Sequence, residues 1–147
     1  MNKVFKYLRQ YSTDPKDVDR LIISAFLKIN KLKPEKNNLL KTYSICKKDK
    51  QEYTALVNFL SIIKTETTNF GFEQLIELFE FVVSPADRVV NGAIYTPEYI
   101  RNYIVKNAFI KIKSHNQKTK ISDIACGCGA FLFNASIELK NRTGKSY

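Results

Sequence analysis

The chain has 147 residues and a mass of 17.0 kDa, of which 44% are hydrophobic and 12% aromatic. This length allows one reasonable core, and the composition excludes a disordered chain. The net charge of +10, from 24 basic and 14 acidic residues, favours an anionic partner, with nucleic acid first among them.

The three cysteines, Cys46, Cys126 and Cys128, lack the spacing of a secreted disulfide scaffold, so a reducing cytoplasm is the expected compartment. The N-terminus has no apolar leader segment, and no stretch approaches the roughly 18 uninterrupted apolar residues of a membrane span. We therefore expect a soluble, cytoplasmic protein without a membrane partner.

Residues 1–90 have the hydrophobic periodicity of a helical N-terminal domain. One amphipathic helix is predicted over 12–33, a second over 49–65 and a third over 72–83, where a Ser-Pro pair ends it. Asp49 and Glu52 resemble a capping pair at the start of the second helix.

The window 28–50 is the most basic part of the chain, with eight lysines against two acidic residues, a local charge of +6. It is typical of a surface that contacts the phosphates of a nucleic acid. A solvated exterior of a helix–loop–helix would look the same, and both interpretations stay open.

A new helix is predicted to start at Thr96-Pro97-Glu98, which combines a capping residue, a proline at the first helical position and an acidic first turn. It should run to the polar linker 114–118. Its expected buried face consists of Ile100, Tyr103, Ile104 and Ala108.

The end of the chain predicts a strand over 120–124, a glycine turn and a helix over 130–139. Helix, strand, glycine turn and helix form the opening of a doubly wound α/β sheet, where ligands bind beyond the carboxyl ends of the strands. The expected fold is therefore mainly α: a helical domain over 1–90, followed over 91–147 by the truncated start of a Rossmann-like domain. One strand alone cannot make a stable sheet.

The glycine turn predicts a ligand site. Gly127 and Gly129 allow positive φ and let bare backbone approach a ligand, while N–H groups that open the next helix can face a carboxylate. A bound anion or zwitterion would suit such a turn.

Two motifs occur in order, over Gly92–Ile100 and Asp123–Leu132. Together they resemble the amino-terminal half of the N-6 adenine DNA methyltransferases of bacterial restriction–modification systems, of the type I or type IIG-like kind. In that family a helical domain precedes a Tyr-Thr-Pro motif and an Asp-Pro-Ala-Cys-Gly-Ser-Gly loop, and both motifs touch S-adenosylmethionine. This chain departs from the loop pattern at Ile124, in place of Pro, and at Cys128, in place of Ser.

The resemblance implies S-adenosyl-L-methionine as the cofactor and a site without a metal. Residues around Thr96 would hold the methionine end, Asp123 would accept from the cofactor ammonium, and Phe131 would form a wall of the pocket. The implied cofactor-binding residues are Tyr95, Thr96, Asp123, Ala125, Cys126, Gly127, Gly129 and Phe131.

The family's catalytic tetrapeptide, Asn or Asp followed by Pro-Pro and an aromatic residue, has no counterpart, because the prolines stand only at 15, 34, 85 and 97. The resemblance therefore implies that residues 91–147 are the incomplete first segment of a methyltransferase domain, and that this chain alone is inactive. The chain would be either the front portion of a longer enzyme or a decayed or truncated copy of one. The complete enzyme would methylate adenine in double-stranded DNA. A specificity or restriction subunit, or a fused domain, would be a further partner.

Two other interpretations compete with this one. The charge and the amphipathic helices are compatible with a small basic helical module that binds DNA or protein without catalysis. Cys126 and Cys128 could also be half of a metal or redox site, but a structural zinc needs four ligands, and neither Cys46 nor the linker residue His115 has a helpful spacing.

Overall fold

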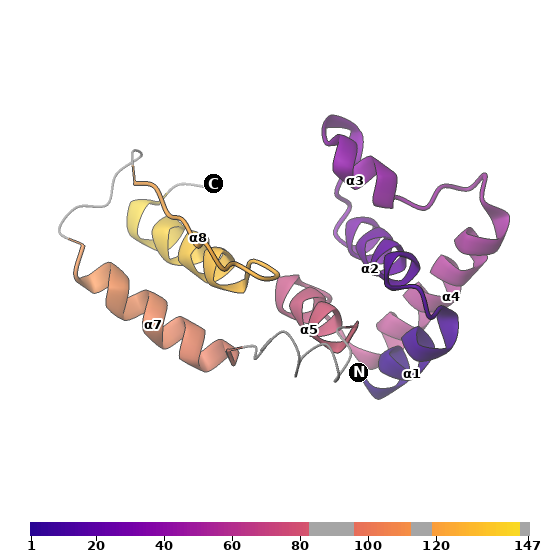
Figure 1. The fold of residues 1–147 in the computed structure, drawn as a ribbon, viewed down its shortest axis with the longest axis horizontal. Helices are drawn as coiled ribbons and strands as arrows, with labels where there is room; N and C mark the ends of the chain where they lie inside the picture. Colours follow the sequence, from indigo (N-terminus) through magenta and orange to yellow (C-terminus); the bar gives the residue numbers. More distant parts are fainter. Residues whose placement is uncertain (83–95, 113–118, 145–147) are drawn as a thin grey trace. The chain divides into compact units, whose positions relative to one another are not determined.

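The computed structural model describes residues 1–82, 96–112 and 119–144, and the chain divides into two compact units, Met1–Val90 and Asn91–Tyr147 (Figure 1). The described helices of the first unit are α1 (Asn2–Tyr11), α2 (Pro15–Ile29), the 3-10 helix η1 (Pro34–Lys36), α3 (Asn38–Tyr43), α4 (Lys50–Glu66) and α5 (Phe72–Val82). Those of the second unit are α7 (Glu98–Ile110) and α8 (Ala130–Thr143).

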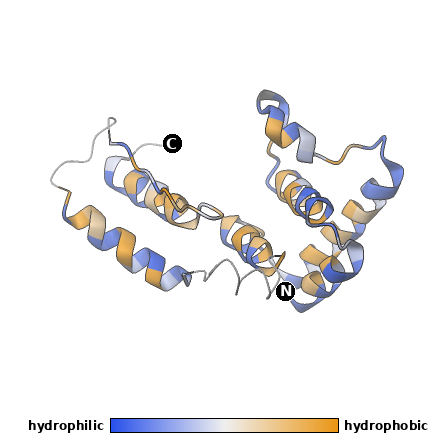
Figure 2. Cartoon of the chain, viewed as in Figure 1, coloured by the Kyte–Doolittle hydropathy of each residue, from blue (hydrophilic) through white to orange (hydrophobic). Residues whose placement is uncertain are grey.

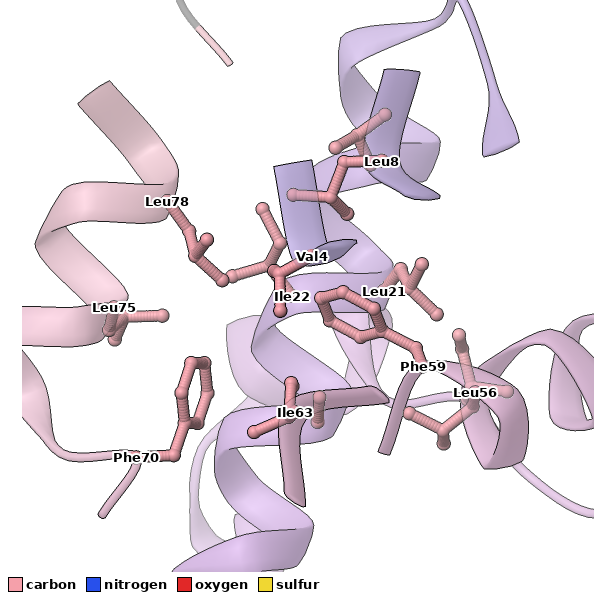
Figure 3. Close-up of a cluster of buried hydrophobic side chains, with 13 residues drawn as sticks. Val4, Leu8, Leu21, Ile22, Leu56, Phe59, Ile63, Phe70, Leu75 and Leu78 are labelled. Carbon is pink, nitrogen blue, oxygen red and sulfur yellow. The ribbon is translucent and has the colours of Figure 1, made fainter. Parts of the chain in front are cut away.

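The helices of the first unit pack around one hydrophobic core (Figure 3). Its helices α1, α2, α4 and α5 each place apolar residues three or four positions apart on one face, and these faces meet. Phe59 is fully buried in this core, and Tyr7 stacks on its ring with 5.6 Å between ring centroids. The core residues that Figure 3 labels are Val4, Leu8, Leu21, Ile22, Leu56, Phe59, Ile63, Phe70, Leu75 and Leu78.

Helix α2 has local signals at both ends. The Asp14 side chain accepts the N–H of Lys16 at 2.9 Å and caps the start. At the other end Lys31 has a φ of +54°, and the N–H of Leu32 donates to the carbonyl of Leu27 at 2.9 Å. This left-handed closure ends the helix at Ile29, earlier than the sequence predicted.

The predicted capping pair of α4 has a different role. Asp49 is the N-cap residue, but its side chain makes no capping hydrogen bond. Instead Arg20 of α2 lies 2.8 Å from the Glu52 carboxylate and 3.6 Å from that of Asp49. The two acidic residues therefore attach the start of α4 to α2.

The second unit contradicts the predicted strand. Residues 119–123 have no regular secondary structure, Ile124 and Ala125 lie in a turn, and no strand occurs anywhere in the described ranges. The expectation of a Rossmann-like start is therefore wrong, whereas a mainly helical chain is confirmed. A strand needs a neighbour for its backbone groups, and none of the described segments pairs with 120–124.

The predicted buried face of α7 is also wrong. Arg101, Val105 and Phe109 are buried, whereas Tyr103 is 70% and Ile104 46% exposed. Hydrophobic residues recur along the whole ribbon of α7 (Figure 2), so periodicity alone does not select the face that packs. The buried stripe, at spacing i, i+4, i+8, begins with a charged residue.

None of the helices in the described ranges is long and apolar enough to cross a membrane.

Truncating a buried side chain should lower the free energy of unfolding of the helical unit, whereas truncating an exposed one should change it little. Leu56 is 1% exposed, and Leu56→Ala should lower the free energy of unfolding of the helical unit by about 2–5 kcal/mol, because it leaves a cavity. Leu39→Ala, at a residue that is 68% exposed, is the control and should change it by less than about 0.5 kcal/mol. Urea unfolding followed by circular dichroism measures both, and equal losses would contradict this core.

Glu66 makes the stability of the helical unit depend on pH. Its carboxylate accepts from the N-terminal ammonium of Met1 at 2.7 Å and from the N–H of Lys3 at 3.3 Å, and these hydrogen bonds lower the pKa of Glu66. A carboxyl with a lowered pKa stabilises the fold above its unfolded pKa of about 4.3 and loses this effect as the pH falls through its folded pKa. Glu66→Gln should therefore lower the melting temperature at neutral pH, with a difference that shrinks in acid.

The control is Glu77→Gln, at an exposed residue of α5. It should leave the melting temperature nearly unchanged at both pH values. A Glu66→Gln difference that stays constant down to about pH 3 would contradict a role for the carboxylate charge.

Candidate functional site

Helices α7 and α8 pack side by side and run in the same direction (Figure 1). Near their starts the Asn134 amide donates to the Asn102 side chain, and near their ends Arg142 donates to the carbonyl of Phe109 at 3.4 Å. Between these contacts lies a small apolar core of Val105, Phe109, Ala135 and Leu139, with Phe131 packed against it. The N-termini of both helices therefore lie at the same end of the unit.

Residues 123–129, which we call the glycine loop, occupy this end, directly before α8. Asp123 Oδ1 accepts the N–H of Ala125 at 3.0 Å, and the Cys126 carbonyl accepts the N–H of Gly129 at 2.7 Å. Gly129 is the N-cap of α8 with no side-chain cap, so the first N–H groups of this helix remain available to an anion.

The two loop glycines are required by backbone conformation. Gly127 has a φ of +52° and Gly129 a φ of +82°, a region that L side chains rarely adopt. A Cβ atom at either position would meet no atom within 4 Å. The surroundings therefore leave room for a side chain, and the positive φ alone disfavours one.

Thr96 does not cap α7 as predicted. The N-cap is Pro97, without a side-chain capping bond, and the helix begins at Glu98. Thr96 is positioned through its backbone instead, because Arg101 Nη1 donates to its carbonyl at 2.7 Å. Arg101 is 4% exposed, so the guanidinium fixes the entry to α7 from within the unit.

An apolar pocket of about 370 Å³ lies between α7, the segment 121–124 and the first turns of α8. Phe131 and Leu132 form its α8 side, and Ile104 and Phe109 form its α7 side. Asp123 is the one charged residue among the described residues that line it. Such a pocket provides apolar walls and a single carboxylate at the edge of the loop.

The predicted site residues fall into three groups. Those in the loop stand together in sequence and in space before α8: Asp123, Ala125, Cys126, Gly127 and Gly129. Phe131 lies in the first turn of α8, and Thr96 lies at the entry to α7. Tyr95 lies outside the described residues, as does His115.

Sequence reasoning missed two buried polar residues near this end, Arg101 and Asn134. Asn134 is 5% exposed, and its Oδ1 has no hydrogen-bond partner among the residues that the structure describes. Both stand in otherwise apolar stripes of their helices, Arg101 with Val105 and Phe109, and Asn134 with Ala130. A polar residue in such a stripe is the signal that could have found them.

The described residues contain no group of three or more His, Cys, Asp or Glu side chains that could hold a metal ion.

The basic window 28–50 lies on the surface of the helical unit. The lysines whose side chains the structure describes there are all exposed: Lys28, Lys31, Lys33, Lys41, Lys47, Lys48 and Lys50. Lys28 donates to the Tyr53 hydroxyl at 3.0 Å and lies 4.3 Å from its ring centroid, and this hydrogen bond lowers the pKa of Tyr53. Buried Ser24 fixes the segment before α4 by donating to the Tyr43 carbonyl and accepting from the N–H of Ile45.

Residues 70–147, more than half of the chain, match the N-6 DNA methylase family. The chain belongs to this family. The match includes α5, α7, the glycine loop and α8, and thus every predicted site residue. The methyltransferase part of the sequence resemblance is thereby confirmed.

A second comparison gives a different relative. Over 109 residues, 74% of this chain, it is 33% identical to the DNA polymerase III subunit gamma of Buchnera aphidicola subsp. Acyrthosiphon pisum (strain APS). The chain spans only 27% of that protein. No solved structure matches this chain.

Proposed function

We propose that this protein binds S-adenosyl-L-methionine at the common N-terminal end of α7 and α8, as the cofactor-binding part of an adenine-specific DNA methyltransferase of a restriction–modification system. One observation carries the proposal: the N-6 DNA methylase match includes a glycine loop that stands at the start of α8, beside a parallel helix. Residues 1–90 form the helical domain of this assignment, and residues 91–147 the cofactor-binding segment.

The chemistry of the loop suits the methionine end of the cofactor. Its carboxylate is complementary to the open N–H groups at the start of α8. Its ammonium is complementary to Asp123, which uses one oxygen for the Ala125 N–H and has a second oxygen for a ligand. When bound, the cofactor supplies an activated methyl group; the residues of this chain bind and orient it.

Each remaining proposed residue has one role. The backbone of Ala125, Cys126, Gly127 and Gly129 approaches the cofactor closely, Phe131 provides an apolar wall, and Tyr95 and Thr96 hold the methionine end from the α7 side. Methyl transfer to the exocyclic amine of adenine is assigned to the whole enzyme, because this chain has no Asn/Asp-Pro-Pro-aromatic sequence. Its proposed setting is the cytoplasm, with double-stranded DNA and a specificity or restriction subunit, or a fused domain, as partners.

A matched pair of glycine substitutions tests the cofactor site. Gly129 and Gly144 bound α8 at its two ends, both have positive φ, and a Cβ at either meets nothing within 4 Å. Gly129→Ala and Gly144→Ala should therefore destabilise the protein similarly, by about 1–2 kcal/mol. Only Gly129→Ala should weaken S-adenosylmethionine binding, by about tenfold or more in isothermal titration calorimetry, because backbone must approach the ligand there.

Three results would count against this cofactor site. They are a wild-type protein that shows no binding heat, equal affinities in both variants, and a loss of affinity in Gly144→Ala alone.

The basic window supports a contact between the helical unit and DNA. Replacing Lys31, Lys33, Lys47 and Lys48 together by Gln should weaken binding of duplex DNA and reduce the slope of log K against log salt, by up to about 0.9 for each phosphate that is no longer neutralised. The control replaces four exposed lysines elsewhere on the unit: Lys3, Lys6, Lys16 and Lys64. Fluorescence anisotropy measures both variants, and equal slopes would show that only total charge matters.

A further inference from the structure

We propose that Cys126 and Cys128 form a thiol modification site, at which a low-molecular-weight disulfide converts the glycine loop into a closed, disulfide-bonded form. One residue, Gly127, separates the two cysteines, and both are thiols in the structure. Cys126 is exposed and Cys128 is half-buried, so a small oxidant can reach the pair. The third thiol, Cys46, lies in the other unit and donates to Asp49 at 3.3 Å.

The backbone permits closure of this small ring. Residues two apart can have Cα atoms no more than about 7 Å apart, and disulfides need roughly 4.4–6.8 Å. Gly127 bends the chain between the two cysteines with a φ of +52°. Apart from its chain neighbours, no atom lies within 4 Å of where a Cβ of Gly127 would be, so this side of the bend is not packed against another segment.

The chemistry is thiol–disulfide exchange with a disulfide RSSR such as oxidised glutathione. The thiolate of one cysteine attacks a sulfur of RSSR, forms a mixed disulfide and releases RS⁻; the second thiolate then attacks the mixed disulfide, forms the Cys126–Cys128 bond and releases a second RS⁻. The two cysteines lose two electrons and two protons, and RSSR becomes two RSH. A thiol reductant reverses both steps.

The consequence of this disulfide for ligand binding rests on the proposed cofactor function. The Cys126 carbonyl accepts the N–H of Gly129 and sets the approach to α8, and the backbone of Cys126 and Gly127 lies within the proposed binding loop. A disulfide across Gly127 imposes a new loop conformation, so the oxidised protein binds S-adenosylmethionine more weakly. The loop thereby links cofactor binding to the redox state of its surroundings.

The test uses the purified protein, the same protein with Cys46→Ser, and Cys128→Ser in that background. After incubation with oxidised glutathione, peptide mass mapping of wild type and Cys46→Ser should find Cys126 linked to Cys128 and a loss of two hydrogens, reversed by dithiothreitol. Calorimetry should find S-adenosylmethionine affinity at least about tenfold lower in the oxidised form. Cys128→Ser, which cannot close the ring, should instead accumulate the glutathione adduct on Cys126.

Mapping decides the modification site independently of cofactor binding. A glutathione adduct on wild-type Cys126 without ring closure, or a link through Cys46, overturns the proposal. A mapped ring with unchanged affinity overturns the link to cofactor binding. A reduced protein that shows no binding heat overturns the proposed function, while the mapping still decides whether the ring forms.

Discussion

The parallel packing of α7 on α8 is the constraint on which the candidate site depends. Two successive helices that run in the same direction need a connection that returns over the length of a helix, about 20 Å for the 13 residues of α7. Residues 119–129 complete that return and reach the start of α8. The glycine loop therefore comes to the end where α7 also begins, and the aligned helix dipoles favour negative charge there. Because the small apolar core and the Asn102–Asn134 hydrogen bond hold this pair together, they also hold the site.

Polar side chains perform a similar positioning role in the helical unit. Arg20 and Ser24 lie one turn apart on α2 and contact the two ends of the segment that joins α3 to α4. Arg20 contacts the start of α4 through charge, whereas buried Ser24 contacts the backbone beside Tyr43 and Ile45. The lysines of this segment project from a backbone that is fixed to the core.

Local sequence signals predicted the helices that became α2, α4, α5 and α8, because each has strong periodicity and a recognisable start or end. They missed α1, whose core contacts at Val4 and Leu8 are made with helices distant in sequence, and α3, which has no buried residue at all. They also chose the wrong face of α7, since an isolated helix does not reveal which apolar side has a partner. The strand failed for the same reason: alternation in 120–124 is local, while pairing is not.

In the candidate site, too, local backbone features were predictable from the sequence, whereas contacts between segments were not. Glycines at positions that need positive φ were evident from the sequence, because only the chirality of the backbone is involved. The role of Arg101 was not, since its bond to the Thr96 carbonyl depends on how the chain enters α7. The interaction of Asn102 with Asn134 depends on the pairing of two helices and lies beyond any single-segment pattern.

Helix α8 begins after one left-handed glycine and ends at another, Gly129 and Gly144. Most helices absorb an extra residue by fraying or growing at an end, but neither end of α8 can do so without moving a glycine out of the conformation that terminates it. An insertion in the first turn of α8 would instead rotate everything beyond it by about 100° and turn Ala135 and Leu139 away from α7. The length of this helix is therefore under tighter constraint than its composition, and insertions or deletions inside it should be far less tolerated than substitutions.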